Sequence, residues 1–245
     1  MIIFTDGSTI NNGKKNAFGG IGVYIPHQNE IKEFKLSYSL VSTNKIKVTN
    51  QISELIATIL GIEASIAITN DTIYVYTDSK YVIDCATTWC KSWITNNWKK
   101  STGKIVDNLW LIYRLVQLTR KYPIIFKHVR AHTDAPLNNS SDEYKIWEGN
   151  NIVDELAQKS SRKLIGYNKN DNDNNNDLKI LKWTSFASKL INGIKKDYKS
   201  DIPFVVEISD FYKKIFCQNV LEDEELSGSE KPKKKLNTNT IIQDI

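Results

Sequence analysis

Three strand-like segments near the N-terminus, followed by alternating helix and strand patterns, constrain the fold of this 245-residue chain most strongly. Residues 2–7, 18–25 and 31–40 are rich in β-branched and aromatic residues, and an Asn-Asn-Gly turn signal separates the first two. Because connections this short join antiparallel strands, the three segments predict a meander.

The next part of the chain, up to about residue 165, alternates between helical and strand periodicity. Helical patterns cover residues 49–66, 79–90, 109–120 and 151–165, and compact strand patterns cover 72–77 and 124–130. Thr49 or Asn50 is expected to cap the first helix. An antiparallel meander followed by β-α-β units predicts an α/β fold with a five-stranded mixed sheet flanked by helices.

The composition changes after Gly166. Residues 167–177 are rich in Asn and Asp and predict a linker, because such sequence cannot bury a core. Residues 178–221 regain apolar and aromatic side chains and predict a small C-terminal segment of unknown role. Residues 222–245 predict a disordered charged tail, whose KPKKK run leaves a nuclear-localisation patch and a solvated tail both open. We therefore expect one main domain over residues 1–166.

The charge and the cysteine content indicate what kind of partner and which cellular compartment to expect. The net charge of +5 suits a polyanionic partner, and 40% hydrophobic residues can fill a globular core. Three cysteines without a CxxC pair favour a reducing compartment over a disulfide framework or a zinc site. The sequence has no long apolar stretch, so we expect neither a signal peptide nor a membrane-spanning helix. We expect an intracellular protein, located in the cytoplasm or the nucleus. A viral protein that acts inside an infected cell is also compatible with this expectation.

Four acidic residues fall at positions where a sheet could bring them together. Asp6 lies at the end of the first predicted strand and Asp78 directly follows the fourth, so the two carboxylates emerge at one edge if those strands are neighbours. Glu54 lies in the first turn of a helix, and Asp154 is expected to begin the last one. Each acid alone is ordinary as a cap or a solvated strand end. Together they would repel one another unless divalent cations such as two Mg²⁺ ions neutralised them.

Five motifs occur in a fixed order along the same region: TDGS (5–8), TNQISE (49–54), YTDSKYV (76–82), VRAH (129–132) and GNNIVDELA (149–157). Over about residues 1–165, this ordered set resembles the cellular and bacterial type 1 ribonuclease H family. The resemblance implies the ribonuclease H-like fold, with the sheet in the order 3-2-1-4-5. It also implies an endonuclease that hydrolyses the RNA strand of RNA/DNA hybrids with two Mg²⁺ ions, Mn²⁺ being the alternative. The products would carry 5′-phosphate and 3′-hydroxyl ends.

The resemblance also implies roles for individual residues. The catalytic and metal-binding carboxylates would be Asp6, Glu54, Asp78 and Asp154. Asp6 would bridge the two ions, Glu54 and Asp78 would hold the ion on the leaving-group side, and Asp154 the ion that activates water. His132 matches the loop histidine that helps protons move or product leave.

Substrate contacts follow from the same resemblance. RNA 2′-hydroxyl groups would be recognised by Asn12, Asn50 and Gln51. A phosphate pocket for the DNA strand would comprise Lys47, Thr49 and Asn108, and the DNA channel would be lined by Tyr81 and Trp89. Ordinary structural roles stay open for several of these residues, in a turn, at a helix cap or in the core.

Residues 89–106 contain three tryptophans and four lysines but no acid. Trp93, Trp98, Lys99 and Lys100 would add phosphate neutralisation and apolar contact to a nucleic-acid groove. The segment resembles the basic protrusion of cellular and bacterial members, although a plain amphipathic helix-turn is the alternative.

The chain also departs from the family pattern. His132 and Asp154 lie 22 positions apart, more than is usual, and the extra residues leave open a longer loop, an altered pH dependence or a misplaced histidine. Ile52 stands near a position that is often arginine, and no N-terminal hybrid-binding domain is expected, because the first catalytic strand begins at Ile2. We expect a monomer with unknown protein partners. Two other functions remain: a DNA-cutting nuclease on this fold, and a non-catalytic hybrid-binding module.

Overall fold

The computed structural model describes residues 1–14, 16–29, 31–42, 47–163, 165, 179–182 and 204–207. The chain divides into two compact units, Met1–Ser209 and Asp210–Ile245, and all described residues belong to the first. The predicted linker (167–177) and charged tail (222–245) lie outside the described residues, as does most of segment 178–221. The division into domains therefore stays a prediction.

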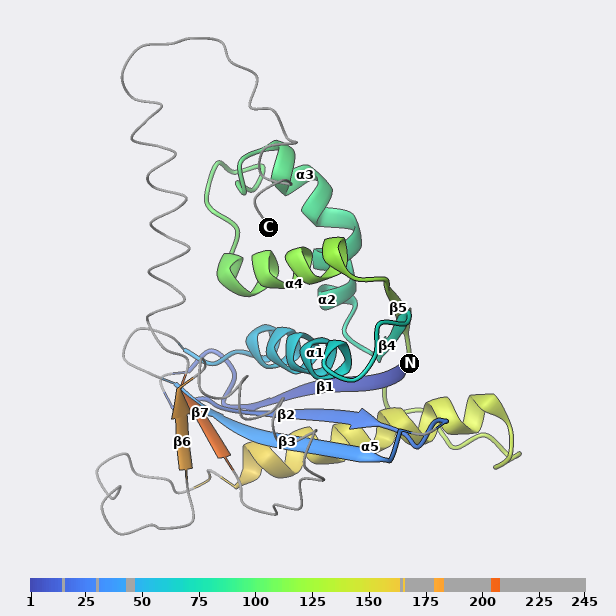
Figure 1. The fold of residues 1–245 in the computed structure, drawn as a ribbon. Helices are drawn as coiled ribbons and strands as arrows, with labels where there is room; N and C mark the ends of the chain where they lie inside the picture. The colour runs from blue at the N-terminus through green and yellow to red at the C-terminus, as the bar shows by residue number, and fades with distance from the viewer. Residues whose placement is uncertain are drawn as a thin grey trace, which may run out of the picture. The chain divides into compact units, whose positions relative to one another are not determined.

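A mixed sheet forms the centre of the first unit (Figure 1). Its antiparallel meander consists of β1 (Ile2–Ile10), β2 (Phe18–Ile25) and β3 (Phe34–Val41). β4 (Ile73–Thr77) runs parallel to β1, and β5 (Ile124–His128) runs parallel to β4. The predicted order 3-2-1-4-5 is confirmed. The sheet continues beyond β3 with two short strands that the sequence did not predict, β7 (Phe204–Glu207) and β6 (Lys179–Lys182).

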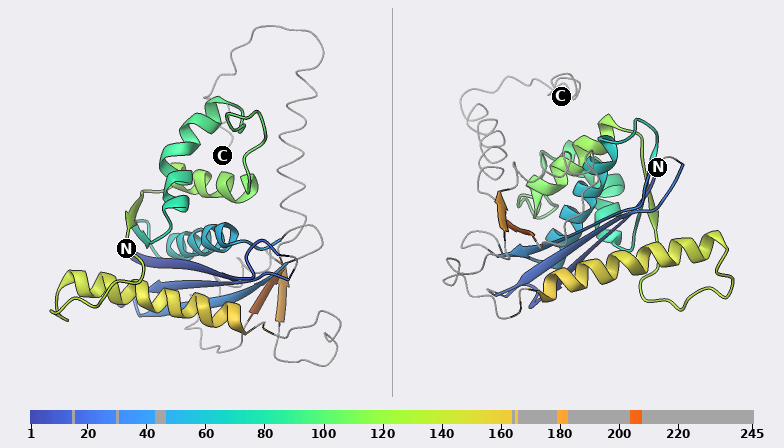
Figure 2. Two further views of the ribbon diagram at one scale, coloured as in Figure 1. Left: turned by 180° about the vertical axis from the view of Figure 1, so that it is seen from behind. Right: turned by 60° about the horizontal axis from the view of Figure 1, so that its bottom comes forward.

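Helices cover both faces of this sheet (Figures 1 and 2). On one side lie α1 (Asn50–Ile66), α2 (Lys80–Asp84), the π-helical turn η1 (Cys85–Trp89), α3 (Cys90–Thr95) and α4 (Leu109–Lys121). α5 (Asp142–Arg162) lies on the other side, against β1, β2 and β3. The helix predicted over 79–90 thus continues to Thr95 through a π-turn, a local register change that periodicity does not reveal.

The start of α5 corrects the sequence prediction. The helix was predicted to begin at residue 151, but it begins at Asp142, and the Ser141 side chain caps it by accepting a hydrogen bond from the Tyr144 N–H at 3.1 Å. Gly149 weakens the local helical signal. Its place is explained by packing, because a Cβ there would lie 2.4 Å from the Phe4 ring. Asp154 is therefore in the middle of α5, and many of the extra residues after His132 are helical.

The buried core lies between the sheet and its helices. Thr49 caps α1, accepting a hydrogen bond from the Ile52 N–H at 3.3 Å, and the helix is buried along most of its length. Cys85 and Cys90 are buried, as expected of packing residues, and burial raises the pKa of the Cys85 thiol to about 12. Across the described ranges, none of the helices combines the length and the apolar character that crossing a bilayer requires.

Candidate active site

Three carboxylates meet above the centre of the sheet. The parallel register pairs Phe4 of β1 with Tyr76 of β4, so Asp6 and Asp78, each two positions further on, come side by side. Glu54 reaches the same place from the first turns of α1. Asp6 and Glu54 are buried and Asp78 is half-buried, and one carboxylate oxygen from each lies within 4.8 Å of the others.

A glycine on β1 allows α1 to come this close. A Cβ on Gly7 would lie 2.2 Å from the Glu54 backbone nitrogen, which leaves no room for any side chain. The Gly7 N–H donates a hydrogen bond to Glu54 Oε2 at 3.2 Å, and Asn50 Nδ2 donates to Glu54 Oε1 at 3.4 Å. Both oxygens of the Glu54 carboxylate are thus oriented by the protein.

Burial and mutual repulsion raise the pKa values of these acids. Burial, and then the charges of Asp78 and Asp154, raise the pKa of Asp6 from 3.8 to about 7. The pKa of Glu54 is well above its ordinary value, first because of burial and then because of Asp6 and Asp78. Burial and Asp154 also raise the pKa of Asp78, against smaller opposing effects of a backbone hydrogen bond and of His132 and His128. A set of crowded carboxylate oxygens that resists ionisation fits a hard divalent cation, which removes the repulsion.

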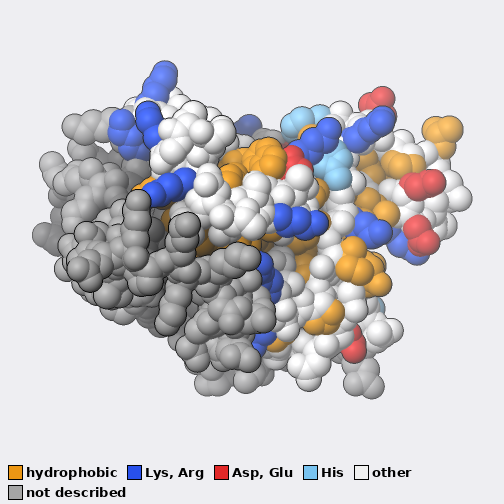
Figure 3. All heavy atoms as spheres, turned by 90° about the horizontal axis from the view of Figure 1, so that it is seen from above, with side chains coloured by type: hydrophobic (Ala, Val, Ile, Leu, Met, Phe, Trp, Pro, Cys, Tyr) orange, Lys and Arg blue, Asp and Glu red, His pale blue; other side chains and the backbone are white. Residues whose placement is uncertain are grey.

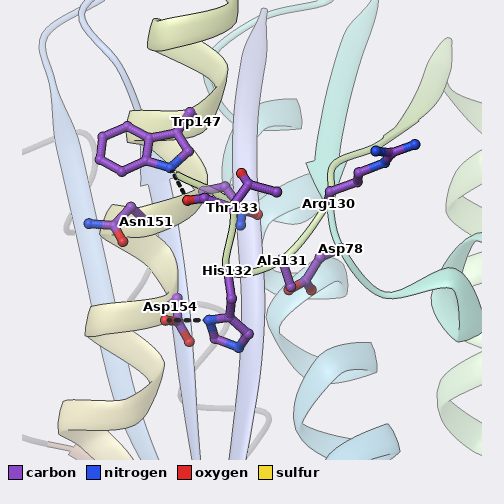
Figure 4. Close-up of a pocket in the computed structure, with 9 residues that line it drawn as sticks. Asp78, Arg130, Ala131, His132, Thr133, Trp147, Asn151 and Asp154 are labelled. Atoms are coloured by element: carbon purple, nitrogen blue, oxygen red, sulfur yellow. Dashed lines mark hydrogen bonds and ion pairs between the residues drawn. The ribbon is translucent and has the colours of Figure 1, made fainter. Parts of the chain in front are cut away.

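Asp154 lies beside this group, on α5. Opposite Asp6 on β2 is Gly22, where a Cβ would lie only 2.4 Å from the Val153 carbonyl oxygen, so this glycine lets α5 approach the sheet. The Asp154 side chain is 25% exposed. Its Oδ1 accepts a hydrogen bond from Gln158 Nε2 at 2.7 Å. Asp154 Oδ2 lies 4.0 Å from His132 Nδ1, and the two side chains point toward one another (Figure 4). The longer spacing in the sequence has not displaced His132 from the site.

A pocket opens between Asp78, Asp154 and the loop after β5. It also involves residues to which the sequence analysis gave no individual role, namely Arg130, Trp147, Asn150 and Asn151. In Figure 4, Trp147, Asn151 and Asp154 project from α5, whereas the guanidinium of Arg130 points away from the carboxylates. Trp147 lies seven positions before Asp154, and Gln158 lies four positions after it, so helical spacing could have found both. The late predicted start of the helix concealed Trp147.

The residues expected to read the RNA strand lie at the N-terminal end of α1. Asn12, Asn50 and Gln51 are exposed. Of the residues expected in the phosphate pocket for the DNA strand, Lys47 is exposed and Thr49 is half-buried. The Asn50 N–H donates a hydrogen bond to Asn12 Oδ1 at 3.1 Å, which ties the β1–β2 turn to the helix. Since Asn50 also contacts Glu54, this polar group adjoins the three carboxylates.

The aromatic residues separate into two groups. The rings of Tyr81, Trp89 and Trp93 form a continuous series, with centroids 6.0 Å and 5.7 Å apart. Asn108 Nδ2 donates a hydrogen bond to the Tyr81 hydroxyl at 3.4 Å. Trp89 is 39% exposed and is therefore not a core residue. Trp98 instead packs against Tyr113 of α4, with centroids 5.3 Å apart.

The lysines of residues 89–106 are not equivalent. Lys99 and Lys100 lie beyond α3, at the turn that leads back towards Ile105. Lys100 Nζ pairs with Asp107 Oδ2 at 2.7 Å, so the acid just outside this segment neutralises one of its charges. On the face shown in Figure 3, Lys and Arg side chains are grouped around a small area where histidine and acidic side chains adjoin.

Comparisons with known proteins agree on one family. The family model "RNase H" matches residues 1–162. Ribonuclease H of Clostridium botulinum is 32% identical over 144 residues, which cover 58% of this chain and 91% of that protein. Ribonuclease H1 of Rattus norvegicus is 29% identical over 166 residues, covering 68% of this chain and 52% of that protein. A foamy viral protease-reverse transcriptase structure, solved in complex with dsDNA, matches 66% of this chain and 94% of that chain, with a TM-score of 0.51 and 21% identity; this likeness concerns the fold.

Proposed function

Because the chain belongs to the ribonuclease H family, the endoribonucleases of RNA/DNA hybrids, we propose that it hydrolyses the RNA strand of such hybrids with divalent cations. Curated relatives with the names ribonuclease H and ribonuclease H1 support this activity. The proposal extends to a two-metal-ion mechanism and to products with 5′-phosphate and 3′-hydroxyl ends.

The observation that carries the proposal is the arrangement of Asp6, Glu54 and Asp78. Three carboxylate oxygens lie within 4.8 Å of one another in a largely buried place where their pKa values are raised. A purely structural cluster of this kind would destabilise the fold at neutral pH. A cation site compensates for that cost, and carboxylates from separate elements are the donors that Mg²⁺ or Mn²⁺ prefers.

The role proposed for each acid rests on the resemblance to the family. Asp6 would contact both ions, Glu54 and Asp78 would hold one ion, and Asp154 would hold the other. When bound, such ions supply an activated water and stabilise the charge of the leaving oxygen. Gly7 and Asn50 fix the Glu54 carboxylate through hydrogen bonds. His132, whose Nδ1 lies 4.0 Å from Asp154 Oδ2, would accept or deliver a proton.

Recognition of the hybrid would use two surfaces. The exposed polar group at the N-terminal end of α1 adjoins the carboxylates and would read RNA 2′-hydroxyl groups through Asn12, Asn50 and Gln51. The DNA strand would be held by the phosphate pocket of Lys47, Thr49 and Asn108, by the rings of Tyr81, Trp89 and Trp93, and by Trp98, Lys99 and Lys100.

An end-labelled RNA/DNA hybrid tests the proposal. We expect the wild type to cut the RNA strand in Mg²⁺ or Mn²⁺ and not in EDTA, leaving 5′ ends that a phosphatase shifts in mobility. Asp78→Asn should abolish cleavage, whereas Asp71→Asn, in an exposed turn, should retain it. Equal cutting of a DNA duplex would indicate a DNA nuclease instead. Binding of the hybrid by a folded wild type that cuts nothing in either metal would indicate a non-catalytic binding module.

A further inference from the structure

The loop between β5 and α5 holds His132 in an unusual backbone conformation. The φ angle of His132 is +50°, a left-handed value that costs energy for a residue with a side chain. The His132 side chain is 76% exposed, so burial does not account for its orientation. A conformation of this kind persists only where neighbouring contacts impose it.

One such contact is made by the next residue. The carbonyl oxygen of Thr133 accepts a hydrogen bond from the indole Nε1–H of Trp147 at 2.8 Å (Figure 4). Trp147 belongs to the N-terminal turns of α5, the part of the helix that the sequence assigned to the loop. The ring of Trp147 also packs against that of Tyr144, with centroids 5.5 Å apart.

The part of α5 that carries Trp147 is packed against the sheet. Ile146, its neighbour in the helix, packs against the cluster formed by Phe4, Tyr24 and Val153. The next turn places Gly149 directly on the Phe4 ring. The indole is therefore presented from a helix that is anchored on the sheet, not from a loop.

The same helix carries Asp154, seven positions after Trp147. Seven residues make about two turns, so both side chains lie on one face of α5. One face of α5 thus carries both Asp154, a carboxylate of the candidate site, and Trp147, which binds the loop that contains His132. In that loop, His132 Nδ1 lies 4.0 Å from the Asp154 carboxylate. Trp147, Thr133, His132 and Asp154 line a single pocket.

We propose that Trp147 is a positioning residue. Through its hydrogen bond to Thr133, it holds the loop so that the His132 side chain lies next to Asp154. The proposal rests on the proposed function, since it assigns His132 a part in turnover. Trp147 acts on the histidine and not on the substrate. Its loss should therefore slow turnover without weakening the binding of the hybrid.

The first test is backbone ¹⁵N relaxation of the free, metal-free protein by NMR. Trp147→Phe keeps an aromatic ring but removes the donor, and Tyr144→Phe is the matched control on the same helix. The order parameters of residues 131–134 should fall from about 0.8 in the wild type to below about 0.6 in Trp147→Phe, the range of flexible backbone. Tyr144→Phe should match the wild type. Equal order parameters in Trp147→Phe and the wild type would overturn the proposal.

The second test is a double-mutant cycle in the hybrid cleavage assay. Trp147→Phe should lower kcat by roughly threefold to tenfold with KM for the hybrid unchanged, and should have no further effect in a His132→Ala background. The same decrease in both backgrounds, or a change confined to KM, would show that Trp147 does not act through His132. Absence of cleavage by the wild type would instead contradict the proposed function, and the relaxation experiment would still decide whether Trp147 anchors the loop.

Discussion

The carboxyl group of Asp6 combines burial with like charge. Its pKa is about 7 in the folded protein but near 3.8 when the group is solvated. Between these pH values the folded state binds a proton that the unfolded state has released. The resulting stability is fully present below about pH 4 and is lost as the pH rises through about 7.

Asp6→Asn should therefore stabilise the metal-free protein at high pH. In EDTA at pH 8, we expect its free energy of unfolding in urea to exceed that of the wild type by about 1–3 kcal/mol, with a smaller difference at pH 5. Asp71→Asn, in an exposed turn, serves as the control. Addition of Mg²⁺ should stabilise the wild type more than Asp6→Asn. A variant less stable than the wild type at pH 8 in EDTA would contradict the role assigned to repulsion.

Gln158 orients the remaining carboxylate. It donates to Asp154 Oδ1 at 2.7 Å, and its own Oε1 accepts from Arg162 Nη2 at 3.1 Å. Gln158→Leu preserves the approximate volume but removes the donor, so we expect an apparent Mg²⁺ affinity about tenfold weaker in activity titrations. Gln117→Leu on α4 controls for the substitution itself. An unchanged Mg²⁺ titration would mean that Asp154 is held without Gln158.

At the scale of elements, α5 shows how a local signal can mark a helix start that periodicity misses. Ser141 caps the helix, and Asp142 and Glu143 place negative charge in its first turn. Negative charge there stabilises the helix by interacting favourably with its dipole. Ser141→Ala should lower the free energy of unfolding by about 1 kcal/mol, measured by urea denaturation. Ser140→Ala, one position earlier, should have a much smaller effect. Equal effects of the two variants would argue against the cap.

At the scale of the whole molecule, the basic residues 89–106 and the carboxylates would have to engage one hybrid together. Neutralising Lys91 and Lys104, which are exposed, should weaken hybrid binding and reduce the slope of log K against log salt by about 2. Lys145→Ala with Lys163→Ala, on the opposite side of the sheet, should leave the slope unchanged. Lys100 should contribute less, because Asp107 already pairs with it. An unaltered salt slope for the Lys91 and Lys104 variant would place the hybrid elsewhere.

Much of the fold was accessible from the sequence because its signals are local. The strand patterns, the helical spacing in α1 and α4, and the Thr49 cap each depend on neighbouring residues. The strand patterns predicted the five strands correctly, and the helical spacing predicted α1 and α4. The resemblance then supplied their order, which β-sheet pairing confirms. Where local preference and packing disagree, prediction was wrong: Gly149 interrupts the helical signal of α5, yet the Phe4 ring requires a glycine there.

The sequence by itself indicated which acids come together, since Asp6 lies near the end of the first predicted strand and Asp78 directly follows the fourth. A shift of one residue in either strand would turn its side chains to the other face of the sheet. Only the tertiary structure decided how close the acids come, how far burial raises their pKa values, and which partners hold Asp154 and His132. It also showed that Asp107 neutralises Lys100 and that Trp147 reaches the His132 loop. These properties depend on distances between residues far apart in the chain, and on exclusion of water from the space between them, neither of which a local pattern contains.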